Sequence, residues 1–157
     1  MATMIRPELS KNNKYWISKH RYYELKHFCL QYPIWKKTVG EIGLSGSTST
    51  YEWRPSSNLP GNPTANLALM KICYSKNIEL VEKLSSEADK YLADYILKAA
   101  TEGYSYTYLK YRLGMPYSRD LYYDRYRRFF WLLSQERDWL MGPLWASFIF
   151  SRDLQGL

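Results

Sequence analysis

The stretch that decides the fold is SYTYLKYRLGMPYSRDLYYDRYRRFFWLL, which spans residues 105–133. It contains a short helical pattern, a tight turn and a longer helical pattern. Leu109 and Leu113 are expected to face the core, Gly114 to form the turn and Met115 to fill the corner. Ser118 can then cap the next helix, because its hydroxyl accepts hydrogen bonds from free backbone N–H groups. These features together predict a DNA-binding type of helix-turn-helix over residues 105–137.

The second helix of this stretch has two distinct faces. One carries an aromatic and apolar stripe at helical spacing and is expected to be buried: Tyr122, Tyr126, Phe129 and Leu133. The other places Arg119, Tyr123 and Arg127 at i, i+4 and i+8, with Arg125 and Arg128 beside them. A recognition helix uses arginine to read guanine, while its N-terminus and other side chains hold phosphates. We therefore predict these residues as DNA contacts: Ser118, Arg119, Tyr123, Arg125, Arg127 and Arg128. The alternative is a bundle helix with a solvated basic face.

The distribution of charge supports contact with a polyanion. The chain has a formal charge of +7 and a sequence pI near 9.3. Seven Lys or Arg and one acid lie in residues 11–37, and six basic and two acidic side chains lie in residues 104–128. Residues 38–103 carry six basic and eight acidic side chains. Basic segments of this kind favour nucleic acid, since neutralising phosphates drives much of the affinity; a solubilising surface is the alternative.

The rest of the chain predicts an all-α protein, a small helical bundle with a long Ser/Gly/Pro-rich internal loop. Residues 1–43 are expected to be a basic arm with helices, including one from Lys19 to Gln31 capped by Ser18. After Pro33 a second short helix, or a bent continuation, is expected to reach Gly43. Residues 44–64 are expected to be a flexible linker or loop, and residues 65–138 a helical scaffold that includes the motif. Residues 139–157 form an apolar tail for packing, dimer contact or partner binding.

Two details of the predicted scaffold depend on local patterns. A helix from Ala65 to about Leu84 should turn one face, with Leu67, Met70, Ile78 and Val81, toward the core. Ser86 and Asp89 are spaced as in a capping box, so the following helix should begin there. That helix should bury the apolar side chains at i, i+3 and i+4 spacing, which are Ala88, Tyr91, Leu92, Tyr95, Ile96 and Ala99, and end at Gly103.

At residues 106–133 the chain resembles a known family. The pattern Tyr-x-Tyr-Leu-Lys, Leu-Gly-Met-Pro, Ser and then Tyr-Tyr-x-Arg-Tyr-Arg-Arg-Phe-Phe-Trp-Leu-Leu is similar to the C-terminal part of phage ArpU/RinA-like late transcription regulators. Those proteins resemble sigma-factor region four. Residues 22–25 and 32–37 are similar to the family's N-terminal helix. The resemblance implies a phage or prophage protein that binds promoter DNA, with Ser118 as helix cap and Arg119, Tyr123, Arg127 and Arg128 as DNA contacts. The segment after Asp138 departs from the family pattern.

The sequence lacks the common signatures of catalysis and cofactor binding. It contains no Gly-rich phosphate loop, His-Glu-x-x-His pair or nucleophile elbow, so we expect no enzyme and no cofactor. His20, His27 and Cys29 do not match a usual zinc spacing. Cys29 and Cys73 are the two cysteines, which predicts a reducing cytoplasm, here that of a bacterial host cell. The apolar stretch at 139–150 is too short to span a membrane.

Two functional hypotheses follow from the sequence. The first is a phage-type transcription regulator that binds duplex DNA through the helix after Ser118, with RNA polymerase or another host protein as a further partner and a homodimer left open. The second is a phage-encoded protein-interaction inhibitor of host machinery, such as an anti-CRISPR protein. The positive charge argues against simple DNA mimicry, which needs acidic side chains.

Overall fold

The computed structural model describes residues 13–44 and 63–152, which form six helices and, within those ranges, no strand. The helices are α1 (Lys19–Leu30), α2 (Tyr32–Leu44), α3 (Pro63–Ala88), α4 (Ala93–Glu102), α5 (Tyr106–Tyr111) and α6 (Arg119–Arg152). The predicted all-α class is confirmed. Residues 45–62, nearly all of the predicted internal loop, lie outside the described residues.

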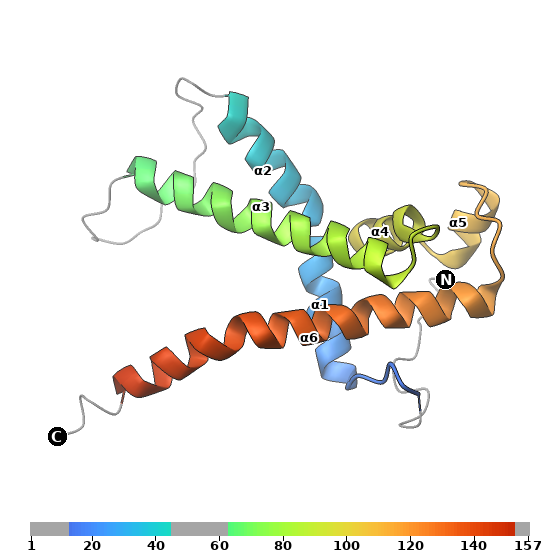
Figure 1. The fold of residues 1–157 in the computed structure, drawn as a ribbon. Helices are drawn as coiled ribbons and strands as arrows, with labels where there is room; N and C mark the ends of the chain where they lie inside the picture. Colours follow the sequence, from blue (N-terminus) through green and yellow to red (C-terminus); the bar gives the residue numbers. More distant parts are fainter. Residues whose placement is uncertain (1–12, 45–62, 153–157) are drawn as a thin grey trace.

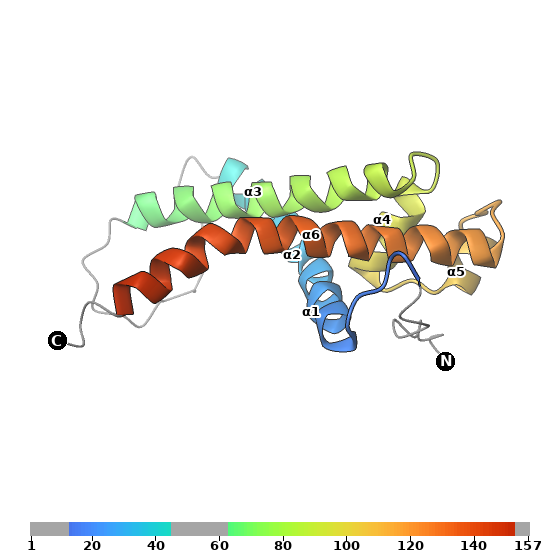
Figure 2. The ribbon, with the colours of Figure 1, turned by 60° about the horizontal axis from the view of Figure 1, so that its bottom comes forward.

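The two long helices α3 and α6 pack together, and the shorter helices are arranged around them (Figure 1). Helix α1 crosses α6 and also contacts α4, while α2 packs mainly against α3. The α3–α4 turn, α5 and the first turn of α6 lie at one end of the molecule in both views (Figure 2). The short first helix of the predicted helix-turn-helix and the start of its second helix therefore lie at that end.

The N-terminal helices begin and end close to the predicted positions. Ser18 caps α1, since its hydroxyl oxygen accepts a hydrogen bond from the Arg21 N–H at 3.4 Å. The helical path breaks at Gln31, and Pro33 lies in the first turn of α2, where a missing N–H costs no helical hydrogen bond. The Tyr32 hydroxyl donates to Glu82 on α3, and Lys36 Nζ lies 3.0 Å from the same carboxylate. These contacts lower the pKa of Glu82, the hydrogen bond from Tyr32 being the largest cause.

Helix α3 differs from the prediction at both ends. It continues past Leu84 to Ala88, and the Ser86 hydroxyl donates to the carbonyl of Glu82 within the helix, so the predicted capping box at Ser86 is wrong. Asp89 makes the turn instead, because its Oδ1 accepts the N–H groups of Tyr91 at 2.9 Å and Leu92 at 3.1 Å. The Tyr91 side chain is exposed rather than buried.

The N-terminal half of α3 is also more exposed than its pattern predicts. Val81 is buried and Ile78 is partly buried against the core, as expected, but Leu67 is exposed. Leu69 and Ile72 are exposed as well. The fully buried positions of α3 therefore lie in its C-terminal half, and the helix packs against α2, α4 and α6.

The core is dominated by aromatic rings on α6. The whole predicted stripe is buried, and Phe130 adds a further buried ring: the set is Tyr122, Tyr126, Phe129, Phe130 and Leu133. Phe130 packs against Tyr22 of α1 and against Tyr126, with ring centres 5.0 Å apart in both pairs. Because α6 runs without a break to Arg152, residues 139–152 continue the helix of the motif. The side chains of this segment lie outside the described part of the structure, so its predicted packing, dimer contact or partner binding stays a prediction.

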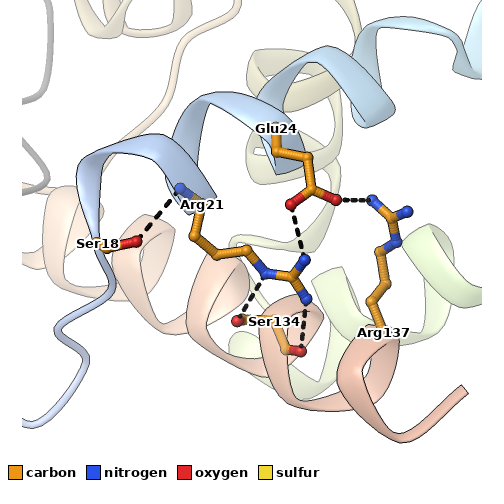
Figure 3. Close-up of polar contacts among 5 residues, drawn as sticks. All are labelled: Ser18, Arg21, Glu24, Ser134 and Arg137. Carbon is orange, nitrogen blue, oxygen red and sulfur yellow. Dashed lines mark hydrogen bonds and ion pairs between the residues drawn. The ribbon is translucent and has the colours of Figure 1, made fainter. Parts of the chain in front are cut away.

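Polar contacts fix α1 on α6 (Figure 3). The Arg21 guanidinium donates to the Ser134 hydroxyl and to the Ser134 carbonyl, both at 3.2 Å. Glu24 accepts from Arg21 at 2.7 Å and from Arg137 at 3.1 Å. Arg21 and Arg137 thus share one carboxylate, and part of the basic character of residues 11–37 is used to hold the bundle together.

Buried hydroxyl and thiol groups make the fold sensitive to alkali. Burial raises the pKa of Tyr22 from 10.0 to about 12, and it raises the pKa of Tyr126 and of Cys29 in the same direction. A raised pKa means that each group stabilises the fold fully below its unfolded value, about 9 for Cys29 and about 10 for the tyrosines, and loses that contribution as the pH rises through its folded value.

We predict that the free energy of unfolding is nearly constant between pH 7 and 8 and falls above about pH 9, first through Cys29 and, above about pH 10, through the buried tyrosines as well. Tyr22 alone is expected to account for about 2–3 kcal/mol by pH 12. Urea melts followed by circular dichroism across this range measure the effect, with tyrosinate absorbance recorded in parallel. A stability that is flat up to pH 12, with all tyrosines ionising near 10, would contradict the buried tyrosine core.

Candidate nucleic-acid interface

The connection between α5 and α6 is built as the sequence predicts. Ser105 caps α5 by accepting from the Tyr108 N–H at 3.3 Å, and Leu109 is buried behind it. Gly114 has a φ of 67°, a left-handed conformation that suits glycine. The Met115 N–H donates to the Leu109 carbonyl at 3.1 Å, which draws the Met115 side chain into the core. Leu113 is only partly buried.

Tyrosine side chains tie α5 to the first turns of α6. The Tyr106 hydroxyl donates to the Tyr117 carbonyl at 3.1 Å. Its ring lies 5.5 Å from the ring of Tyr122 and 6.0 Å from that of Tyr123, measured between centres. Aromatic pairs at these separations stabilise packing beyond their buried area. The start of α6 is consequently held in a fixed position relative to α5.

The first turn of α6 faces solvent. Ser118 caps it, with its Oγ accepting the Leu121 N–H at 3.4 Å, as predicted. Ser118, Arg119, Asp120 and Leu121 are all exposed. The Arg119 guanidinium carbon lies 5.5 Å from the centre of the Tyr123 ring, a cation–π contact that leaves the charge unneutralised. Arg119 forms no ion pair with any acidic side chain in the described part of the chain.

Two of the predicted DNA contacts, Arg125 and Arg128, also join α6 to the end of α3 and the turn after it. Arg128 Nη1 donates to the carbonyl of Ala88, the last residue of α3, at 3.2 Å. A cation at this position satisfies a helix C-terminal carbonyl and the negative end of its dipole. Arg125 Nε lies 3.2 Å from Asp89 Oδ2, and Nη1 lies 3.4 Å from Asp124 Oδ2. Both arginines are half-buried and take part in intramolecular contacts.

The remaining predicted residues lie along one side of α6. Tyr123 and Arg127 are half-buried, and Arg127 Nε is buried with no hydrogen-bond partner among the described residues. Farther along α6, the Trp131 ring lies 5.9 Å from that of Tyr15 in the segment before α1. The solvent-exposed part of the predicted basic face is therefore smaller than the sequence suggested. Arg119 is exposed, whereas Tyr123 and Arg127 are half-buried.

Sequence reasoning missed a second group of exposed residues on α5. Tyr108, Lys110 and Tyr111 of α5 and Arg112 directly after it are exposed, and α5 lies at the same end of the molecule as the start of α6 (Figure 1). The signal was available, because Leu109 as the single buried position of a short helix leaves the opposite face to solvent. No local sequence pattern predicts the Asp89–Arg125 ion pair, because the two residues lie far apart in the chain.

The described part of the chain contains no candidate metal centre, and comparison of the chain with known proteins finds no match. In the ranges 13–44 and 63–152, no three His, Cys, Asp or Glu side chains are grouped so that they could hold a metal ion. No helix in these ranges combines the length and apolar character of a membrane span. No family model, curated protein or solved structure matches the chain. The resemblance to the ArpU/RinA-like regulators stays a prediction based on residues 106–133.

Proposed function

We propose that this protein binds duplex DNA through a helix-turn-helix made of α5, residues 112–118 and α6, with α6 as the recognition helix. The observation that carries the proposal is the first turn of α6. It is exposed and capped by Ser118, and it presents Arg119 without an acidic partner in the described residues. A helix start with free N–H groups and an unpaired arginine is a suitable site for a phosphate or a guanine edge.

The individual residues would act in different ways. The amides at the start of α6 and Arg119 would hold the DNA backbone or a base, and Tyr123 positions Arg119 through the ring contact. Arg127, one turn farther along the helix, extends the same side. Asp120 is exposed in the first turn and repels phosphate, so it favours an approach in which the carboxylate accepts from a cytosine amino group in the major groove. Arg125 and Arg128 support the interface by fixing α6 on α3.

The biological role that fits this interface best is transcription regulation in a phage or prophage. The family resemblance at residues 106–133 supports this role, and the basic segments favour a nucleic-acid partner. RNA polymerase is the host protein that such a regulator would meet at a promoter. The competing hypothesis is that the protein inhibits host machinery by binding a host protein, and the following experiment separates the two.

The experiment is a salt titration of the full-length protein with a fluorescent duplex, read by anisotropy. The proposal predicts that log affinity falls linearly with log salt, with a slope magnitude of at least about 2 from Arg119 and Arg127. Nucleic acid should also copurify at low salt. No binding to pooled random duplexes at low salt, together with stoichiometric copurification of a host protein, would overturn the proposal in favour of the inhibitor.

A further inference from the structure

Three tyrosines lie on α5 and in the segment directly before it. Tyr108 and Tyr111 are three residues apart on α5 and are therefore neighbours on the helix surface, while Tyr104 precedes the helix cap at Ser105. Tyr108 is 41% exposed and Tyr111 is 78% exposed. The rings of Tyr104 and Tyr108 lie 4.5 Å apart at an interplanar angle of 34°. We call these three residues the tyrosine row.

Positive charge flanks the tyrosine row. Lys110 and Arg112 are exposed, and neither forms an ion pair with an acidic side chain in the described residues. Lys110 Nζ lies 5.7 Å from the centre of the Tyr106 ring. The two cations are therefore available to an anionic ligand.

Exposed rings beside unpaired cations match the chemistry of a single nucleic-acid strand. Proteins that hold single strands combine cations along the backbone with aromatic rings on which bases stack. Base pairs inside a duplex already stack on one another, so a tyrosine ring can take a base face only where the strands are unpaired. An apolar protein partner would leave the charges of Lys110 and Arg112 without a function.

We propose that the tyrosine row binds unpaired bases in DNA whose duplex part is held by α6. This inference rests on the proposed duplex binding, and it names the DNA form that the protein prefers: a duplex next to an open segment. The two surfaces lie at the same end of the molecule, α5 directly preceding the turn that leads into α6 (Figure 1). A protein with this preference would select DNA that is opening or already open.

The test compares the affinity of the full-length protein for two probes that share one sequence. One is a fully paired duplex, and the other carries a central unpaired bubble. The wild type should bind the bubble probe about tenfold more tightly for one stacked base. Tyr111→Ala should lose this preference while keeping its affinity for the paired duplex. Tyr111→Phe should keep the preference, because stacking needs the ring and not the hydroxyl.

Tyr91→Ala is the matched control, since Tyr91 is 79% exposed but lies in the α3–α4 turn outside the tyrosine row. It should keep the wild-type preference. Equal binding of the wild type to both probes would overturn the stacking inference and leave duplex binding standing. Loss of preference in Tyr111→Phe would also overturn it, in favour of a hydroxyl contact with phosphate. Absence of binding to either probe would instead remove the proposed function itself.

Discussion

Replacing Phe130 by alanine is expected to lower the free energy of unfolding by about 3–5 kcal/mol, the usual cost of deleting a buried phenyl ring. Phe130 is 1% exposed and contacts three rings, those of Tyr22, Tyr126 and Phe129, at 5.0–5.1 Å between centres. It lies where α1 crosses α6, so no neighbour can fill the cavity without moving a helix. Urea denaturation followed by circular dichroism measures the loss.

Leu121→Ala provides the matched control for this prediction. Leu121 is on the same helix but is 36% exposed and lies outside the core cluster, so its truncation removes less buried surface and opens no internal cavity. We expect a change below about 1 kcal/mol. A Phe130→Ala protein that loses no more stability than Leu121→Ala would show that α1 and α6 do not form the core described above.

A large loss of affinity for duplex DNA is expected when two arginines of α6 are removed. Arg119→Ala combined with Arg127→Ala is expected to weaken duplex binding at least about tenfold at low salt, because two cations leave the proposed interface. Neither arginine forms an ion pair with a described acidic residue. Their removal should therefore leave the unfolding midpoint nearly unchanged. Arg128 is kept, since its removal would free the Ala88 carbonyl and destabilise the α3–α6 contact.

A matched control removes the same amount of charge elsewhere. Lys76 and Lys83 lie on α3, are exposed and form no ion pair with the described residues. Lys76→Ala combined with Lys83→Ala should retain most of the affinity, because the lost charges lie outside the interface and act only through screened long-range attraction. Equal losses in both double variants would assign the binding to overall charge.

The local parts of the structure could be predicted from the sequence. Ser105–Leu133 contains its own caps, turn glycine and buried stripe, and each depends on residues a few positions apart. The left-handed Gly114 and the cap at Ser118 follow from intrinsic conformational preferences. The burial of Tyr122, Tyr126 and Phe129 follows from helical periodicity alone.

The features that the sequence could not predict depend on contacts between distant segments. Arg125 and Arg128 look like free cations in the sequence, because their partners Asp89 and Ala88 lie about forty positions earlier in the chain. The Ser86 prediction failed because Asp89, which can form the same kind of cap, competes with it and allows α3 to continue for a further turn. Leu67 is exposed because α4 and α6 pack against the other end of α3, which periodicity cannot indicate.

The central claim is that DNA meets the first turns of α6, and the most direct test is the salt slope of duplex affinity measured side by side for the wild type and the two double variants. We predict that the Arg119→Ala, Arg127→Ala protein shows a slope smaller in magnitude by about 2, while the Lys76→Ala, Lys83→Ala protein keeps the wild-type slope. An unchanged slope in the arginine variant, with its melting curve intact, would contradict the claim and place the DNA on another surface.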